Sequence, residues 1–276
     1  MPVSIPTLTL NDGRPMPQLG FGVYQLDVSQ TPDIVGRAIA AGYRSIDTAA
    51  IYGNEAGIGR AIREAAVGRD DLYITTKLWN DDQGLDATRR AFDASLKRLG
   101  LDRVDLYLIH WPCPEKGLFV ETWKELIRFR EEGRATSIGV SNFTPAHLQR
   151  LISETGIVPV VNQIELHPHF QQPALREAHA RHGIVTESWS PLGRGPVLAD
   201  PVLAGIARAH DRSPAQVALR WHIQNGFVAI PKTATPARIA ENAALFDFTL
   251  SDTEMAQIAR LDRPDGRTGP DPETFG

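Results

Sequence analysis

Four polar residues are spaced so that they could act together in proton transfer: Asp47, Tyr52, Lys77 and His110. Asp47, Lys77 and His110 each end a short apolar run, 30 and then 33 residues apart (47 to 77, 77 to 110). An aspartate and a lysine that end adjacent strands can pair and keep each other charged. A nearby ammonium should then lower the pKa of Tyr52, which lies within loop reach. The group therefore predicts a tyrosine that protonates a carbonyl oxygen, with a cation and an imidazole stabilising the developing negative charge.

Each of these residues also has an ordinary structural explanation when it is taken alone. Asp47 could be a helix cap or a satisfied core carboxylate, and Tyr52 could be a packing residue. Lys77 could extend from the end of a strand into solvent, and His110 could be a hydrogen-bonded core histidine. Their occurrence together at successive strand ends favours the catalytic interpretation.

Short strands and helices alternate along the chain and must position these residues. Runs rich in β-branched and aromatic residues predict eight strands, at 21–24, 43–47, 72–77, 104–110, 136–141, 160–165, 184–189 and 227–232. Helix-like stretches include 33–42, 86–100, 214–224 and 236–246, three of which follow a capping residue and a proline: Thr31-Pro32, Ser213-Pro214 and Thr235-Pro236. This alternation predicts parallel βαβ units, and the eightfold count predicts an α/β fold of the (β/α)8 TIM barrel type. In such a barrel the chemistry lies at the carboxyl ends of the strands.

Several segments are additional to the eight repeats. Residues 7–20 predict an N-terminal β-hairpin with Asp12-Gly13 as its turn. The segments 197–210 and 251–261 predict two extra helices, and the turn-rich tail 262–276 should lie over one end of the barrel. No linker-like or low-complexity stretch interrupts the pattern, so residues 1–276 are expected to form a single domain.

Composition excludes several classes of function. The 276 residues carry a net charge of −4, which gives no electrostatic footprint for nucleic acid. No apolar run is long enough for a membrane span, and the N-terminus lacks a signal-peptide pattern, so a cytoplasmic location is expected. Cys113 is the sole cysteine, which excludes an internal disulfide and a multi-cysteine metal site. Nothing marks a self-complementary apolar patch, so a monomer is expected.

Some local motifs have weaker interpretations. Tyr73 and Lys77 match a Y-x-x-x-K pattern, but the pattern needs a helix and this segment is strand-like, so Tyr73 is predicted to be a core residue. The paired glycines at 20–22 and 57–59 lack the third glycine of a dinucleotide-binding fingerprint. His167 and His169 have no acidic or cysteine partner at ligand spacing, which favours a polar pair over a metal site.

Seven segments, spread in order along nearly the whole chain, resemble the aldo-keto reductase family: GYRSIDTAAIYGNE, ITTKLW, DLYLIHWP, SIGVSNF, VNQIELHP, ESWSPLGRG and IPKTATPARIAEN. Length and short loops place the resemblance nearest to bacterial 2,5-diketo-D-gluconate reductase-like members. The resemblance implies that Asp47, Tyr52, Lys77 and His110 form a catalytic tetrad. Tyr52 would be its general acid, His110 would orient the carbonyl, and Asp47 and Lys77 would tune Tyr52.

The resemblance also implies an NADPH/NADP+ site. Ser141, Asn142 and Gln163 would hold the nicotinamide carboxamide, and Trp189 would stack on the ring, where tyrosine is common in the family. The remaining contacts would be Leu192, Gly193 and Arg194 over the pyrophosphate, Lys232, Thr233 and Arg238 at the 2′-phosphate, and Glu241 and Asn242 at the adenine. A lysine, a hydroxyl and an arginine near a helix N-terminus form a plausible anion site, which favours NADPH over NADH.

An aromatic mouth is predicted around Tyr24, Trp79, Trp111 and Trp189, and it would suit small, flat or apolar carbonyl compounds. The expected activity is NADPH-dependent reduction of aldehydes or ketones, such as diketones or keto-sugar acids, without a metal. Two alternatives remain open at this point. One is a sugar or polyol dehydrogenase that runs in the oxidative direction, and the other is a non-catalytic nucleotide-sensing subunit on the same fold.

Overall fold

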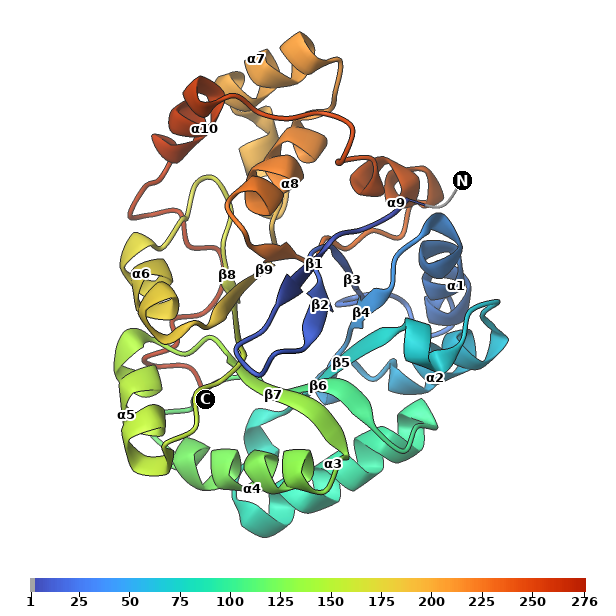
Figure 1. Cartoon of the computed structure of the whole chain (residues 1–276), viewed down its shortest axis with the longest axis vertical. Helices are drawn as coiled ribbons and strands as arrows, with labels where there is room; N and C mark the ends of the chain where they lie inside the picture. Colours follow the sequence, from blue (N-terminus) through green and yellow to red (C-terminus); the bar gives the residue numbers. More distant parts are fainter. Residues whose placement is uncertain (1–2) are drawn as a thin grey trace.

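Eight parallel strands form one sheet in a computed structural model that describes residues 3–276. Strands that follow each other in the chain are neighbours in the sheet, and a bridge between Leu19 and Ala229 brings the last strand back to the first. The sheet therefore closes into a (β/α)8 barrel, which confirms the predicted fold (Figure 1). The strands are β3 (Gly20–Gly22), β4 (Ser45–Asp47), β5 (Tyr73–Leu78), β6 (Val104–Ile109), β7 (Ala135–Ser141), β8 (Val161–Glu165), β9 (Val185–Trp189) and β10 (Val228–Ala229).

Helices surround the strands, as Figure 1 shows. The barrel helices are α1 (Thr31–Ala41), α2 (Glu55–Glu64), α3 (Leu85–Leu99), α4 (Phe119–Glu131), α5 (Pro145–Thr155), α6 (Pro173–His182), α8 (Pro214–Gln224) and α9 (Pro236–Ala243). The two extra helices are α7 (Pro201–His210) and α10 (Asp252–Ala259), and short 3-10 helices occur at η1 (Ala50–Tyr52), η2 (Arg69–Asp71), η3 (Asn80–Asp82) and η4 (Pro196–Ala199). None of the helices within residues 3–276 is long and apolar enough to cross a membrane.

Three details of the predicted helices are corrected by the structure. Ser213 caps α8 as expected, but Thr31 lies inside α1, where its hydroxyl donates to the Asp27 carbonyl at 2.9 Å. Thr235 occupies the N-cap position of α9 without a side-chain capping bond. The segment 197–210 is not one helix, because it is interrupted at Asp200, whose carboxylate caps α7 just before a first-turn proline.

The N-terminal hairpin closes one end of the barrel. Strands β1 (Thr7–Thr9) and β2 (Pro15–Pro17) pair antiparallel, and Gly13 takes a φ of 83° in the turn, as the predicted Asp12-Gly13 turn requires. Figure 1 shows the hairpin across the centre of the ring of strands. Leu10 and Met16 pack there against side chains from inside the barrel, including Leu106. The accessible chemistry must therefore lie at the opposite, carboxyl end of the strands.

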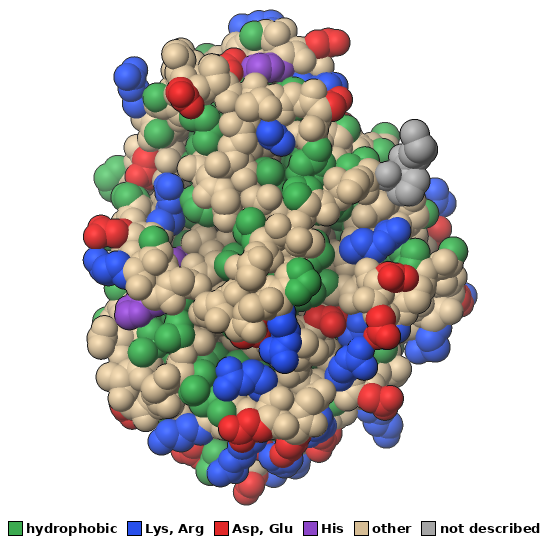
Figure 2. Space-filling view, viewed as in Figure 1, with side chains coloured by type: hydrophobic (Ala, Val, Ile, Leu, Met, Phe, Trp, Pro, Cys, Tyr) green, Lys and Arg blue, Asp and Glu red, His purple; other side chains and the backbone are tan. Residues whose placement is uncertain are grey.

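The hairpin face carries mixed charges. Figure 2 shows basic and acidic side chains interspersed over this face, with no basic patch of the kind that binds nucleic acid.

Alternation along the strands decides which side chains face the barrel interior. Every second residue points inward, so Asp47 shares the inner face of β4 with Ser45, and Lys77 shares that of β5 with Thr75. Glu187 and Trp189 are related in the same way on β9. Trp189 is half-buried, and the other inward-facing residues named here are buried and polar. The interior of the barrel is therefore polar near the carboxyl ends of these strands.

Candidate active site

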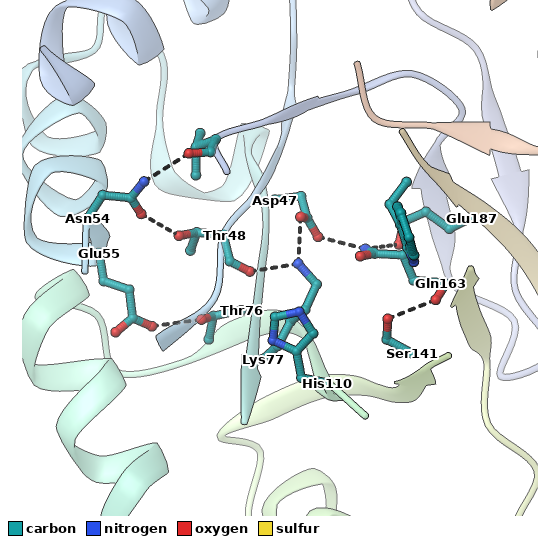
Figure 3. A network of polar contacts seen from close by, with 12 residues as sticks. Asp47, Thr48, Asn54, Glu55, Thr76, Lys77, His110, Ser141, Gln163 and Glu187 are labelled. Carbon is teal, nitrogen blue, oxygen red and sulfur yellow. Dashed lines mark hydrogen bonds and ion pairs between the residues drawn. The ribbon is translucent and has the colours of Figure 1, made fainter. Parts of the chain in front are cut away.

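A buried ion pair lies at the carboxyl end of β4 and β5. Lys77 Nζ lies 2.6 Å from Asp47 Oδ1 and donates a second bond to the Thr48 carbonyl at 2.9 Å (Figure 3). The Lys77 side chain is 0% exposed, so its charge depends on these oxygen partners. The pairing predicted from the sequence is therefore present, and it leaves one ammonium hydrogen for another group.

Tyr52 lies directly beside this pair. It ends η1, and Gly53 turns the chain with a φ of 69°. The Tyr52 ring centroid is 5.3 Å from Lys77 Nζ and 5.0 Å from the ring of Tyr24. Burial raises the pKa of Tyr52, and Lys77 offsets this only in part. The expected lowering of this pKa is therefore wrong, because desolvation of the phenolate outweighs the lysine charge. Tyr52 is a protonated phenol at neutral pH.

His110 follows β6 and faces Tyr52. The two ring centroids are 5.8 Å apart, and the Trp79 ring lies 5.2 Å from His110 on another side. Burial and the neighbouring Lys77 hold the pKa of His110 well below its usual 6.5. The imidazole is therefore neutral, and a neutral imidazole can donate one hydrogen bond to a carbonyl oxygen without releasing a proton.

Gln163 and Glu187 lie on the other side of Asp47. Gln163 Nε2 donates to Asp47 Oδ2 and to Glu187 Oε2, both at 2.8 Å (Figure 3). Glu187 is fully buried, and burial, followed by the charge of Asp47, raises its pKa to about 8. The sequence reading missed Glu187. The signal was its place two residues before Trp189 on one strand, which puts both side chains on the same face.

Hydrogen bonds connect the predicted carboxamide-binding residues. Asn142 Nδ2 donates to the His110 carbonyl at 2.9 Å, and Trp189 Nε1 donates to Asn142 Oδ1 at 2.8 Å. Ser141 Oγ donates to the Gln163 carbonyl at 2.8 Å. Asn142 has a φ of 63°, a conformation that asparagine tolerates better than most residues. The structure thus brings Ser141, Asn142, Gln163 and Trp189 together beside the tetrad.

The other predicted cofactor residues lie on the loop after β9 and around the start of α9. Gly193 and Arg194 both have a φ of 53°, and Gly193 is buried while Leu192 is half-buried. A Cβ on Gly193 would lie 3.0 Å from Val197, so the loop packs closely here.

Two cations around α9 have no acidic partner among the described residues. Lys232 and Arg238 are exposed, and neither forms an ion pair with any residue in 3–276. Thr233 and Asn242 are buried, and Glu241 is half-buried. Two unpaired cations beside a buried hydroxyl suit an anionic group.

Aromatic residues form the mouth of the site, and the C-terminal tail adds one that the sequence reading missed. Tyr24 is 52% exposed, whereas Trp111 is buried. The Phe275 ring lies 4.6 Å from Trp111 and 6.5 Å from Trp79. An isolated aromatic in a turn-rich tail has no periodicity that would predict this position.

Glu165, at the end of β8, holds the tail in place. Its Oε1 accepts from Thr268 N at 2.7 Å, and its Oε2 accepts from Gly269 N at 2.9 Å. The prediction that the tail covers one end of the barrel is therefore confirmed, and the covered end is the one that holds the tetrad.

The remaining motifs behave as structural features. Tyr73 is partly buried and packs against the core cluster that includes Leu10 and Met16 of the hairpin, which confirms its predicted place in the core. The predicted polar pair of His167 and His169 is wrong: His167 lies 3.4 Å from Glu165, and His169 lies 2.9 Å from Asp200, so each contacts its own carboxylate.

Comparison with known proteins agrees with this geometry. Residues 18–263 match the model of the aldo/keto reductase family. The chain is 57% identical to an aldo-keto reductase of Mycolicibacterium smegmatis and 51% identical to the methylglyoxal reductase DkgA of Escherichia coli, covering 98% of each chain in both cases. Among solved structures, a Gox0644 mutant in complex with NADPH superimposes with a TM-score of 0.96 at 49% identity, over 99% of both chains. The chain therefore belongs to the aldo/keto reductase family.

Proposed function

We propose that this protein reduces the carbonyl group of small aldehydes or ketones with NADPH and that Tyr52 donates the proton. The observation that carries the proposal is the buried Asp47–Lys77 pair, held against a protonated Tyr52 and a neutral His110. As an aldo-keto reductase, the protein is an NADP-dependent oxidoreductase.

The residues of the chain divide the reaction between them. NADPH supplies the hydride when it is bound. Tyr52 gives its phenolic proton to the carbonyl oxygen, and the ammonium of Lys77 stabilises the phenolate that this leaves. His110 donates a hydrogen bond that orients the carbonyl. Asp47 keeps Lys77 charged in its buried position.

The described residues fit a phosphorylated dinucleotide. Lys232 and Arg238 are cations without carboxylate partners, which suits the 2′-phosphate. Gln163 and Asn142 supply amide groups beside the tetrad, and Trp189 supplies an aromatic face. The other residues proposed to hold the cofactor are Ser141, Leu192, Gly193, Arg194, Thr233, Glu241 and Asn242.

The aromatic mouth favours small or apolar substrates. Tyr24, Trp79, Trp111 and Phe275 offer flat apolar faces around His110. Relatives named methylglyoxal reductase, at 50–53% identity, make 2-oxoaldehydes the first substrates to test, with diketones and keto-sugar acids next. A cytoplasmic location and a monomeric state stay predictions of the sequence.

The first experiment follows NADPH consumption by absorbance with methylglyoxal, an aromatic aldehyde, a diketone, a keto-sugar acid and an aldose. Wild type is compared with Tyr52→Phe and with Tyr107→Phe, a matched control that removes a buried hydroxyl without a hydrogen-bond partner in residues 3–276, on a ring that stacks on Phe92 away from the site. We expect Tyr52→Phe to lower kcat by about 10²- to 10⁴-fold, with NADPH affinity and the control unchanged.

Two other outcomes would point elsewhere. Unchanged turnover in Tyr52→Phe would refute the proposed proton donor. NADPH binding without turnover of any carbonyl would favour the nucleotide-sensing alternative, and turnover only of alcohols with NADP+ would favour the dehydrogenase.

A further inference from the structure

Glu187 is a buried carboxyl group that the proposed chemistry leaves without a role. It lies on the inner face of β9 and is 0% exposed. Its Oε2 accepts a hydrogen bond from Gln163 Nε2 at 2.8 Å, and its Oε1 has no partner in the described chain. A fully ionised carboxylate would leave a buried charged oxygen without a donor, at a large desolvation cost. A neutral carboxylic acid fits the site better.

The charges around Glu187 support the same conclusion. On its inner side it faces Asp47 from β4 and Lys77 and Tyr73 from β5, with the uncharged Gln163 on β8 and the uncharged Val228 and Ala229 on β10. Tyr73 is neutral, because burial raises its pKa well above 10. Within residues 3–276, Lys77 is therefore the one cation facing these two carboxyl groups, and it donates a hydrogen bond, at 2.6 Å, to Asp47 and not to Glu187.

The groups on the outer side of β9 add no charge. His179 contacts Thr186 and His222 contacts Ser188, and burial lowers the pKa of both histidines to about 3.

Gln163 depends on both carboxyl groups for its orientation. Its Nε2 donates to Asp47 on one side and to Glu187 on the other, as Figure 3 shows. A flipped amide would direct Oε1 at the ionised Asp47 carboxylate, which is repulsive, and would lose the hydrogen bond to Asp47. Both amide hydrogens are therefore committed, and Oε1 is left to accept from another molecule, such as an amide N–H of a bound ligand.

We propose that Glu187 is a positioning residue for carbonyl reduction, which orients the Gln163 amide and, while it carries a proton, keeps the Asp47–Lys77–Glu187 cluster electrically neutral. This inference rests on the proposed function. Ionisation of Glu187 gives the cluster a net charge of −1 next to Tyr52. Negative charge there opposes both the oxyanion that develops on the substrate and the phenolate left on Tyr52. Reduction should therefore slow as Glu187 loses its proton.

The pH at which reduction slows distinguishes ionisation of Glu187 from ionisation of Tyr52. Burial raises the pKa of Glu187 to about 8, whereas the pKa of Tyr52 is raised above 10. An activity loss caused by Glu187 should therefore begin at lower pH than one caused by ionisation of Tyr52.

The test compares three variants with wild type. Glu187→Gln keeps an oxygen acceptor for Gln163 but cannot ionise, and Glu187→Leu removes the acceptor. Glu125→Gln is the matched control, because Glu125 is buried but contacts Arg89 and Arg128 on the outer layer of the barrel. The measurements are kcat for reduction against pH, the NADPH dissociation constant, and infrared spectra of the cofactor-free protein.

We expect Glu187→Gln to match wild type near pH 7 and to exceed it by about tenfold on the alkaline side. The infrared spectrum of wild type near pH 6.5 should contain a protonated-carboxyl band that disappears near pH 9.5 and is absent from Glu187→Gln. Glu187→Leu should weaken NADPH binding by about tenfold at all pH values, and Glu187→Gln should restore it. The control should share the wild-type pH profile.

Different results would overturn different parts of the proposal. Identical pH profiles for wild type and Glu187→Gln would refute the proton role, as would the absence of the infrared band near pH 6.5. Wild-type NADPH affinity in Glu187→Leu would refute the positioning role. If wild type reduced no carbonyl at all, the proposed function would fail, yet the spectra and binding constants would still decide the state and role of Glu187.

Discussion

Burial decides the chemistry of the individual residues more strongly than charge does. Lys77 acts to lower the pKa of Tyr52, but burial of the phenol at the carboxyl end of the barrel raises this pKa more strongly. His110 is likewise kept neutral mainly by burial. Both groups therefore keep one protonation state through neutral pH, and neither needs to titrate for the protein to work there.

Arg238 provides a test at the scale of a single residue. It is exposed, and in the described part of the chain it has no acidic partner, so its charge is available for a 2′-phosphate. We expect Arg238→Gln to raise the NADPH KM by about tenfold or more and to leave the NADH KM nearly unchanged, because only NADPH carries that phosphate. Steady-state kinetics with both cofactors measures this.

The control for this experiment is Arg150→Gln, an exposed arginine paired with Glu154 on α5. An equal rise of the NADPH KM and the NADH KM in Arg238→Gln would show that Arg238 does not bind the 2′-phosphate.

At the scale of elements, the two ends of the barrel are closed by different devices. The hairpin closes the amino end with apolar side chains, and its Asp12-Gly13 turn predicted it from the sequence. The tail closes part of the carboxyl end, held by backbone N–H groups of Thr268 and Gly269 on Glu165. The hairpin is part of the core, and the C-terminal tail borders the candidate active site.

Phe275 tests the role of the tail. Its ring contacts the rings of Trp79 and Trp111, so its loss should remove an apolar wall of the mouth. We expect Phe275→Ala to raise KM for aromatic aldehydes by about three- to tenfold, while KM for methylglyoxal changes less, because a small substrate contacts less of the wall. Phe248→Ala, beside His210 on the outer layer, is the control. Equal KM changes for both substrates would contradict this role.

At the scale of the whole molecule, the buried polar interior makes stability depend on pH. Burial, followed by the charge of Asp47, raises the pKa of Glu187 from an ordinary 4.5 to about 8 in the folded protein. Between these values the folded state holds a proton that the unfolded state has released, so stability falls as the pH rises through this window. Above about pH 8 the folded protein must bury a second carboxylate charge.

Glu187→Gln should remove this dependence. We expect its free energy of unfolding to exceed that of wild type by an amount that grows from about pH 4.5 to pH 8, reaching on the order of a few kcal/mol. Chemical denaturation across this range measures the difference. A constant difference at all pH values would show that Glu187 has the same protonation state in both the folded and the unfolded protein.

The sequence alone determined the barrel, its hairpin and the Asp47–Lys77 pair. Strand periodicity, turn residues and the spacing of strand ends are local patterns, and a parallel barrel converts that spacing directly into proximity. The tertiary structure decided the direction in which the pKa of Tyr52 shifts. It also decided the position of Phe275 at the mouth and the contact of Glu187 with Gln163. These depend on burial and on contacts between residues more than 20 apart, such as Gln163 and Glu187 across 24 residues. Local patterns carry no measure of desolvation, and desolvation is the term that decides the protonation states in this site.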